Sequence, residues 1–319
     1  MSSGQAGTTE LRERVGISIA AADAPALLQI IDEAEASGVR QLWMTQSPTT
    51  IDSLTLYAAA SQRTKEVRFG TSIVPTYPRH PLALAQQAAT VAALGSGRLR
   101  LGVGPSHRPA IEPTYGIKME SPLVHLREYV EVLRGILWAG KIEHSGQFIT
   151  ANATLNNPPQ VPLLISTLGE GAFRLAGEVS DGAISWNCPP AYLHNVGLPA
   201  MQAGAQAAGR STPPLVAHSW VSLNRDTAAV RQAVGKTIAF YAQLPFYANM
   251  FAAAGYPVEN GAVSDELIDS LVVTGDADAV AARLKELLDS GLDELLLTNV
   301  VLDNEAEDRS QLFQLIGRL

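Results

Sequence analysis

The sequence is poor in cysteine and in paired metal ligands. Its 319 residues include one cysteine, Cys188, which alone can form neither an internal disulfide framework nor a structural zinc site. The six histidines are scattered, without helical HxxxH spacing, so we expect no bound metal. Basic residues are also few. Their number is 23 against 31 acidic residues, and the net charge of -8 disfavours nucleic acid and anionic membrane surfaces as partners. A small molecule is the expected partner.

A targeting segment is also missing from the sequence. The first ten residues lack a cationic region followed by an apolar core, so we expect no secretory signal, a loose tail over residues 1–12 and a cytoplasmic protein. The uncharged stretch 237–258 has about the length of a membrane-spanning helix. A proline and several amides inside it would be costly in hydrocarbon. We therefore expect no membrane span there, but the wall of a pocket or a subunit interface.

Signatures of several common enzyme classes are absent as well. The turn after the first predicted strand, AAADAP, has no glycine, and Gly102 with Gly104 is too small a set for a dinucleotide-binding fingerprint. The sequence contains no Walker loop and no G-x-S-x-G nucleophile elbow. These absences disfavour dinucleotide binding on an open sheet, nucleotide binding by a phosphate loop, and serine-dependent acyl transfer.

Short apolar runs alternate with helical patterns along the whole chain. Strands that are apolar on both faces and alternate with helices form parallel sheets, and eight such units are typical of the closed (β/α)8 TIM barrel. We therefore expect a single α/β barrel domain over residues 1–319, with insertions at 140–161 and 237–263 on the C-terminal face; an open doubly wound sheet is the alternative. The expected strands are 15–20, 40–45, 67–74, 98–104, 163–167, 182–187, 215–220 and 294–300, and the expected helices include 25–37, 54–63, 82–94, 123–139 and 171–179.

Polar residues follow most of these strands. In a parallel barrel the carboxyl ends of the strands share the functional face. His107 follows the fourth strand, and a histidine with a near-neutral pKa can deliver a proton, although a loop histidine can also be a plain surface residue. The turn 167–171 places Gly169 and Gly171 at the start of a helix, which suits a phosphate group or forms an ordinary strand-to-helix turn.

Three ordered motifs carry a family resemblance: GTSIVPTYPRHPLALAQ (70–86), GRLRLGVGPSH (97–107) and LGEGAFRLAGEVSDGAISW (168–186). They resemble the bacterial-luciferase-like superfamily. Within it, the sequence is most similar to the branch that uses the 5-deazaflavin coenzyme F420, which includes methylene-tetrahydromethanopterin reductase and F420-dependent glucose-6-phosphate dehydrogenase. The resemblance implies a TIM barrel, bound F420 with FMN as the alternative, and a homodimer.

The resemblance also assigns roles to particular residues. It implies a cis peptide between Ser72 and Ile73, in a bulge that lies against the ring of the coenzyme. The position of His107 holds a carboxylic acid that reaches the substrate in the deazaflavin sugar-phosphate dehydrogenase, so His107 becomes the expected proton donor, with water as the alternative. Glu170 would repel a phosphate unless its side chain turns to solvent. The full expected coenzyme site consists of Thr45, Gln46, Ser72, Ile73, Val74, Gly104, Pro105, Ser106, Thr167, Leu168, Gly169, Glu170 and Gly171.

The second strand departs from the family pattern. Relatives commonly end it in an acidic residue and a histidine, whereas this chain has Thr45 and Gln46. Without a base, alcohol oxidation is poorly supported, while hydride addition needs only geometry and a proton donor. We therefore expect a reductase that transfers hydride from reduced F420 to an activated C=C or C=N bond of a small organic substrate. An FMN-dependent luciferase-like monooxygenase and a non-catalytic flavin-binding barrel are the alternatives. The expected substrate pocket consists of Trp186, Asn187, Phe246 and Tyr247.

Overall fold

Parallel strands close on one another in the computed structural model, which describes residues 10–258, 261–302 and 304–319. Strand β12 pairs with β1 and β9 pairs with β10, so the eight-stranded barrel has no open edge, and the predicted TIM barrel is confirmed. In pairing order the strands are β1 (Val15–Ser18), β2 (Gln41–Met44), β3 (Arg68–Thr71) with β4 (Val74–Pro75), β5 (Leu99–Gly104), β8 (Leu163–Thr167), β9 (Gly182–Ser185), β10 (Leu215–Ser222) and β12 (Glu294–Asn299).

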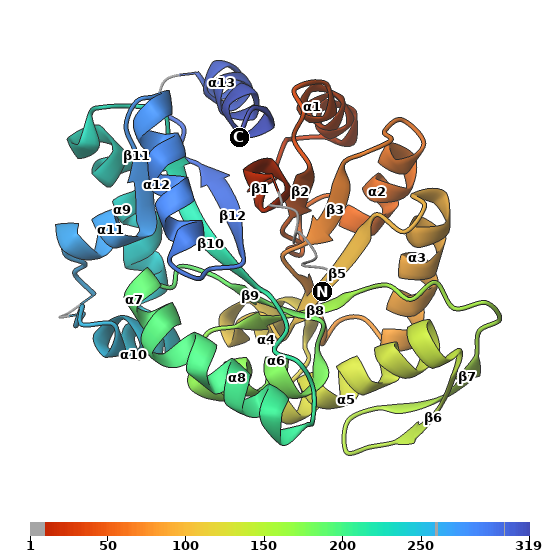
Figure 1. The fold of residues 1–319 in the computed structure, drawn as a ribbon. Coiled ribbons are helices and arrows are strands. Elements are labelled where there is room, and N and C mark those ends of the chain that lie inside the picture. The colour runs from red at the N-terminus through yellow and green to blue at the C-terminus, as the bar shows by residue number, and fades with distance from the viewer. Residues whose placement is uncertain (1–9, 259–260, 303) are drawn as a thin grey trace, which may run out of the picture.

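Helices surround the strands on the outside, and the first and last long helices lie next to each other (Figure 1). Many of them begin at a polar side chain that accepts a backbone N–H, as Asp23 accepts from Ala26, because the first turn of a helix leaves such donors free. The helices are α1 (Ala24–Ala36), α2 (Ser53–Ser61), α3 (Pro81–Leu94), α4 (Arg108–Tyr115), α5 (Pro122–Arg134), α6 (Glu170–Val179), α7 (Pro190–Tyr192), α8 (Leu198–Ala207), α9 (Thr227–Ala242), α10 (Pro245–Ala253), α11 (Asp265–Leu271), α12 (Ala277–Asp289) and α13 (Glu305–Gly317). A short strand, β11 (Val272–Thr274), pairs with β10 outside the barrel.

The first expected insertion is an antiparallel hairpin of β6 (Lys141–Ser145) and β7 (Thr150–Thr154). Glu128 on α5 holds its turn, since this buried carboxylate accepts the backbone N–H groups of residues 147, 148 and 149 at 2.8, 2.9 and 3.0 Å. Burial raises the pKa of Glu128, but these hydrogen bonds together lower it by a larger amount. The pKa of Glu128 therefore lies below its ordinary value. The hairpin is therefore fixed to the body of the barrel.

The boundaries of two other expected segments differ in the structure. Residues 237–242 are not part of an insertion, because they form the last turns of α9, whose buried residues Val230, Val234, Ile238 and Ala242 continue one helical stripe. Residues 259–260 of that segment lie outside the described residues. The expected tail of residues 1–12 ends earlier, since Leu11–Glu13 forms a 3-10 turn; residues 1–9 are not described. No helix in the described ranges is long and apolar enough to cross a membrane.

The interior of the barrel is filled around Trp43. Gly16 and Gly70 on the neighbouring strands make room for its indole, because a Cβ atom at Gly70 would lie 2.2 Å from the ring and one at Gly16 would lie 2.5 Å from Nε1. At the N-terminal end, the Arg100 guanidinium stacks 5.1 Å from the Trp43 ring centroid and binds Glu294 through two bonds of 2.6 and 2.8 Å. The apolar cluster around Trp43 consists of Leu164, Ile184, Val216 and Leu296.

The pairing between β9 and β10 is short. These strands share two register positions, Ala183 with Leu215 and Ile184 with Val216, as many as β1 shares with β2 and β3 with β5, whereas β10 and β12 pair over six. Beyond Ile184 the backbones of β9 and β10 no longer pair, and side chains continue the contact there. Trp186 stacks on His218, and Asn187 accepts a hydrogen bond from Trp220 Nε1 at 2.8 Å. One junction of the barrel is thus completed by side chains.

Candidate functional site

The side chains that follow the Trp43 cluster toward the carboxyl ends of the strands are polar. Side chains of a strand alternate between its faces, so residues two positions beyond the cluster also point inward. At these inward-facing positions, Thr45 is exposed to solvent and Ser166 and Thr298 are partly exposed. The N-terminal end is closed by Arg100 and Glu294. The C-terminal face is therefore the open, polar end, where a ligand can reach the interior.

The third predicted strand is broken at this face. The peptide bond between Ser72 and Ile73 is cis, at the position that the resemblance implies, and it separates β3 from β4. Thr45 Oγ1 donates to the carbonyl oxygen of Ser72 at 2.9 Å, and the backbone N–H of Gln46 donates to that of Ile73 at 3.3 Å. Val74 is buried in the core between the sheet and the helices, so its side chain does not belong to the site.

The Gln46 side chain is engaged in the loop after β2. Its Nε2 donates to Asp52 at 3.1 Å, and its Oε1 accepts from Ser53 at 2.9 Å. Asp52 also caps α2 and pairs with Arg79 at 2.8 Å. Burial raises the pKa of Asp52, but the hydrogen bonds from Thr55 and Arg79 lower it below its ordinary value. The loop thus contains a carboxylate that is a weak base and an amide that orders its backbone.

The glycines at the end of β5 serve strand packing. A Cβ atom at Gly104, a residue of the expected coenzyme site, would lie 2.1 Å from Ser166 Oγ, and one at Gly102 would lie 2.0 Å from the carbonyl oxygen of Thr71. Atoms of neighbouring strands already fill both spaces. Both positions therefore require glycine, because the neighbouring residues approach more closely than a methyl group allows. Pro105 and Ser106, which follow, are partly exposed.

His107 lies within an aromatic group that two later helices supply. Its ring centroid is 6.2 Å from that of Tyr241 on α9 and 5.6 Å from that of Tyr247 on α10. Burial lowers the pKa of His107 and raises the pKa values of both tyrosines, so all three groups are mainly uncharged at neutral pH. Tyr241 was not predicted from the sequence, since its position in a helix gave no sign of the strand turn that it contacts.

Helix α6 begins at the turn after β8 without a side-chain cap. Gly169 is its N-cap residue, and no atom lies within 4 Å of a Cβ placed there. Gly169, Glu170 and Gly171 are exposed, so Glu170 lies in solvent and the first N–H groups of the helix can receive an anion. Thr167 is buried and donates to the carbonyl oxygen of Ile184 at 3.2 Å, and Leu168 packs against the core. Thr167 is therefore closed to a ligand, whereas Gly169 to Gly171 are accessible from solvent.

The expected substrate residues divide into two groups. Trp186 is partly exposed, and Asn187 is fully buried behind it. Tyr247 is buried beside His107, but Phe246 is 73% exposed. Successive helical residues are about 100° apart around the axis, so Phe246 and Tyr247 cannot share one face. The placement of Phe246 in a pocket wall is therefore wrong for this structure.

His218 is a buried residue of this face that the sequence analysis did not select. Its ring stacks on Trp186 at a centroid distance of 3.7 Å and forms a 3.0 Å hydrogen bond with Thr298 Oγ1. Burial lowers the pKa of His218 to about 3, so its imidazole is neutral. The alternation in LVAHSW, which places Val216, His218 and Trp220 on one face, could have identified it.

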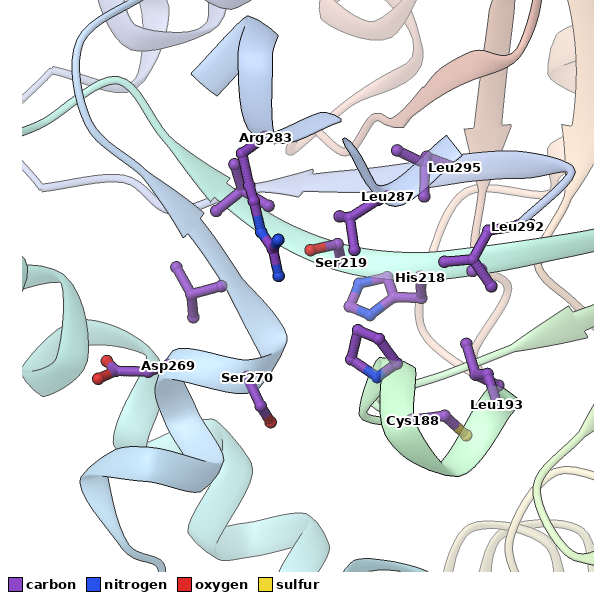
Figure 2. Close-up of a pocket in the computed structure, with 14 residues that line it drawn as sticks. Cys188, Leu193, His218, Ser219, Asp269, Ser270, Arg283, Leu287, Leu292 and Leu295 are labelled. Carbon is purple, nitrogen blue, oxygen red and sulfur yellow. The ribbon is translucent and has the colours of Figure 1, made fainter. Parts of the chain in front are cut away.

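A small cavity lies beside β10, as Figure 2 shows. His218 and its neighbours Ala217 and Ser219 line it together with Cys188 and parts of α7, α11 and α12. Its volume of about 20 Å³ suits a single water molecule. Burial raises the pKa of the Cys188 thiol to about 12, so this thiol is unreactive. Within the described ranges, no group of side chains is arranged to hold a metal ion.

Comparisons with known proteins agree with this geometry. Residues 5–294 match the sequence model of the family described as luciferase-like monooxygenase. The F420-dependent glucose-6-phosphate dehydrogenase of Nocardia farcinica is 31% identical and aligns with 83% of each chain. The 5,10-methylenetetrahydromethanopterin reductase of Methanopyrus kandleri is 23% identical, over 95% of this chain and 96% of that protein. The solved structure of an F420-dependent secondary alcohol dehydrogenase with an F420-acetone adduct superimposes with a TM-score of 0.80 at 21% identity, covering 95% and 97%.

Proposed function

The chain belongs to the luciferase-like monooxygenase family, and we propose that it transfers hydride from reduced coenzyme F420 to an activated C=C or C=N bond of a small organic substrate. It is an F420-dependent oxidoreductase, in line with the dehydrogenase and the reductase that align with at least 83% of its length. The choice of reaction and direction rests on the residues of the C-terminal face.

The face has features that fit a flat ring with an attached phosphate. The uncapped start of α6 offers N–H groups, and the space beside Gly169 that a side chain would fill leaves room for a phosphate oxygen. Ile73 is partly exposed and packs on the Trp43 cluster, so it offers an apolar surface to a ring. Gly169 to Gly171 would hold the phosphate, and Ser72, Ile73 and the backbone after Gly104 would border the ring. When bound, F420 supplies a two-electron hydride donor.

The observation that carries the direction is the absence of an available base where β2 ends. The Thr45 hydroxyl donates its proton in a hydrogen bond to the carbonyl oxygen of Ser72, and the Gln46 amide has no basic atom. The nearby Asp52 carboxylate has a lowered pKa and is paired with Arg79. Oxidation of an alcohol requires a group that removes its hydroxyl proton, whereas hydride addition to an activated double bond requires a proton donor afterwards.

His107 is the proposed proton donor. Because burial lowers its pKa, the fraction of His107 that carries a donatable proton increases as the pH falls below neutrality. The buried ring of Tyr247 and the partly exposed ring of Tyr241 cover one side of the imidazole. Water remains the alternative donor, and the two are separated by the effect of removing His107.

Binding and turnover together test the proposal. The purified protein is titrated with F420 and with FMN, and reduced F420 is then supplied with cyclohex-2-enone or 1-pyrroline. We expect tighter binding of F420 and reduction of at least one of the two compounds. Efficient oxidation of isopropanol or glucose 6-phosphate by oxidised F420 would refute the direction, and rapid oxygen consumption with reduced FMN would establish the monooxygenase alternative. Binding of either coenzyme without any turnover would indicate a non-catalytic barrel.

We also propose that the protein is a cytoplasmic homodimer. Support for the dimer comes from two large apolar side chains on adjoining helices, Phe240 at 61% exposure and Phe246 at 73%. Such side chains on one surface are typical of contact regions. Sedimentation equilibrium of the protein and of a Phe240→Ser, Phe246→Ser double variant tests it, because a monomer in both cases would contradict the proposal.

A further inference from the structure

Asn187, just after β9, forms a hydrogen-bonded chain with His218 and Trp220 on β10 and Thr298 on β12, and the protons of this chain can be assigned one by one. The backbone N–H of Asn187 donates to His218 Nδ1 at 3.4 Å, so Nδ1 is the accepting nitrogen of a neutral imidazole. The ring proton therefore resides on Nε2. Nε2 in turn donates to Thr298 Oγ1 at 3.0 Å. This assignment fixes the tautomer of a buried histidine.

Two donor groups at the ends of this hydrogen-bonded chain lack an acceptor within the described ranges: the Thr298 hydroxyl and the Asn187 side-chain amide. Thr298 Oγ1 already accepts from His218, and its own hydroxyl proton has no acceptor among the described residues. Trp220 Nε1 donates to Asn187 Oδ1, while the buried Nδ2 of Asn187 has no partner in the same part of the structure. A buried donor without an acceptor is costly, and such groups in native structures normally meet a ligand or water.

The surroundings define the kind of acceptor that fits. No lysine, arginine or protonated histidine belongs to the chain of Asn187, His218, Trp220 and Thr298, so an anion would find no countercharge there. The Trp186 ring, stacked on His218, adds a flat apolar surface. Neutral donors beside an aromatic surface match a neutral carbonyl group on a planar molecule. Thr298 is partly exposed and can reach such a group from the C-terminal face.

We propose that the Thr298 hydroxyl, oriented by His218, donates a hydrogen bond to a carbonyl oxygen of the bound molecules; Asn187, which is fully buried, supports this network from behind Trp186. This inference rests on the proposed function, because the carbonyl belongs either to the substrate or to the ring of the coenzyme. In the first case the substrate class narrows to double bonds conjugated with a carbonyl group, such as enones and N-acylimines.

The hydrogen bond would act on electrons without transferring its proton. Bound F420 in its reduced form would supply the hydride; as the β carbon of an enone accepts it, the π pair of the C=C bond moves toward the α carbon and the carbonyl oxygen. The Thr298 hydroxyl stabilises the charge that develops on that oxygen. A proton from His107 or water then binds the α carbon and restores the C=O bond. Thr298 is thus a binding and polarising residue.

The test compares Thr298→Val with Thr298→Ser, which keeps the hydroxyl. Thr154→Val, on the exposed strand β7, is the matched control for the same change outside the site. Dissociation constants are measured for F420 and for cyclohex-2-enone, the latter by quenching of tryptophan fluorescence. Loss of one neutral donor should weaken binding of the carbonyl-bearing partner about five- to tenfold in Thr298→Val. Thr298→Ser and Thr154→Val should remain close to the parent protein.

The outcome identifies the source of the carbonyl. A weaker F420 complex in Thr298→Val places the carbonyl on the coenzyme, and weaker binding of cyclohex-2-enone alone places it on the substrate. Unchanged affinity for both, no measurable binding of the enone with unchanged F420 affinity, or an equal loss in Thr298→Ser would overturn the proposal.

Nitrogen NMR of histidine-labelled protein tests the proton assignment without any ligand. His218 should be neutral with its proton on Nε2 from about pH 5 to 8, as a pKa shifted well below that window requires. A protonated Nδ1 would overturn the assignment. Failure of the parent protein to bind F420 would instead refute the proposed function and leave this measurement and the enone titration to decide the inference.

Discussion

Replacing Gly169 with aspartate should weaken coenzyme binding while slightly stabilising the fold. Gly169 has φ -89° and ψ 162°, which any residue adopts, and no atom lies within 4 Å of a Cβ placed there. The molecule itself shows what an aspartate does at this position. Asp23, Asp52 and Asp276 begin their helices and accept an N–H of the first turn at 2.8, 2.8 and 2.9 Å. An aspartate at 169 should cap α6 in the same way.

The two effects differ in size and in sign. Exchange of glycine for aspartate at an N-cap stabilises a helix by only a few tenths of a kcal/mol. A phosphate at the same place would lose the N–H donor that the aspartate accepts, which is worth about 1.5–3 kcal/mol for a charged acceptor, and it would also face a new negative charge. The expected loss in binding is about 3 kcal/mol, or roughly 100-fold in the dissociation constant.

Titration of F420 and thermal unfolding measure these two effects separately. Gly169→Asn is the control for charge, because it has nearly the same shape and also caps helices. Gly169→Ala adds bulk without a cap, and Glu170→Ala removes a neighbouring negative charge that should leave affinity unchanged or improved. An aspartate variant that is more stable yet binds F420 within threefold of the parent would refute the phosphate assignment, as would a large loss of affinity in Glu170→Ala.

Three further predictions concern the proton donor, the core and the hairpin. His107→Ala should slow turnover about 100-fold with little change in coenzyme affinity, and the rate of the parent enzyme should fall as the pH rises through the lowered pKa of His107, which steady-state pH profiles measure. Gly70→Ala should destabilise the protein by about 1–3 kcal/mol, because its Cβ atom overlaps the Trp43 ring, and chemical denaturation with Gly169→Ala as the control measures it. Glu128→Gln should lower the stability of the protein at pH 7. Because the pKa of Glu128 is depressed in the folded state, the stability difference between parent and variant should disappear as the pH falls through that pKa. Thermal unfolding of both proteins at pH 7 and pH 3 measures this difference.

The barrel was predictable because its signal is local. Each strand and its helix carry their own apolar pattern, and the expected strand that begins at Leu163 lies within the observed one. The second half of helix α9 was assigned to an insertion because its uncharged residues, from Thr237, differ in composition from the first half, although both halves share one buried stripe. The break at Ser72 could not be deduced from periodicity, since the apolar run continues across it. It was implied only by the family resemblance.

The role of a site residue was predictable only where residues next to it in the sequence determine that role. Gly169 follows from its turn, because the start of a helix is defined by neighbours in the sequence. The partners of His107 were not predictable, since Tyr241 and Tyr247 reach it from helices more than a hundred residues later. The close contact between Gly104 and Ser166 was not predictable for the same reason, because the two residues belong to different strands and no local pattern pairs them.

The short pairing of β9 with β10 gives the barrel a place where ligand affinity and local opening are linked. Only two register positions join these backbones, and Asn187 and His218 continue the junction through side chains. A molecule that binds the free donors of this network binds only while the junction is closed. Its binding therefore reduces transient separation of β9 from β10. Amide hydrogens near Ile184 and Val216 should therefore exchange more slowly when the site is filled. The rate of local opening at this junction would then depend on whether a ligand is bound.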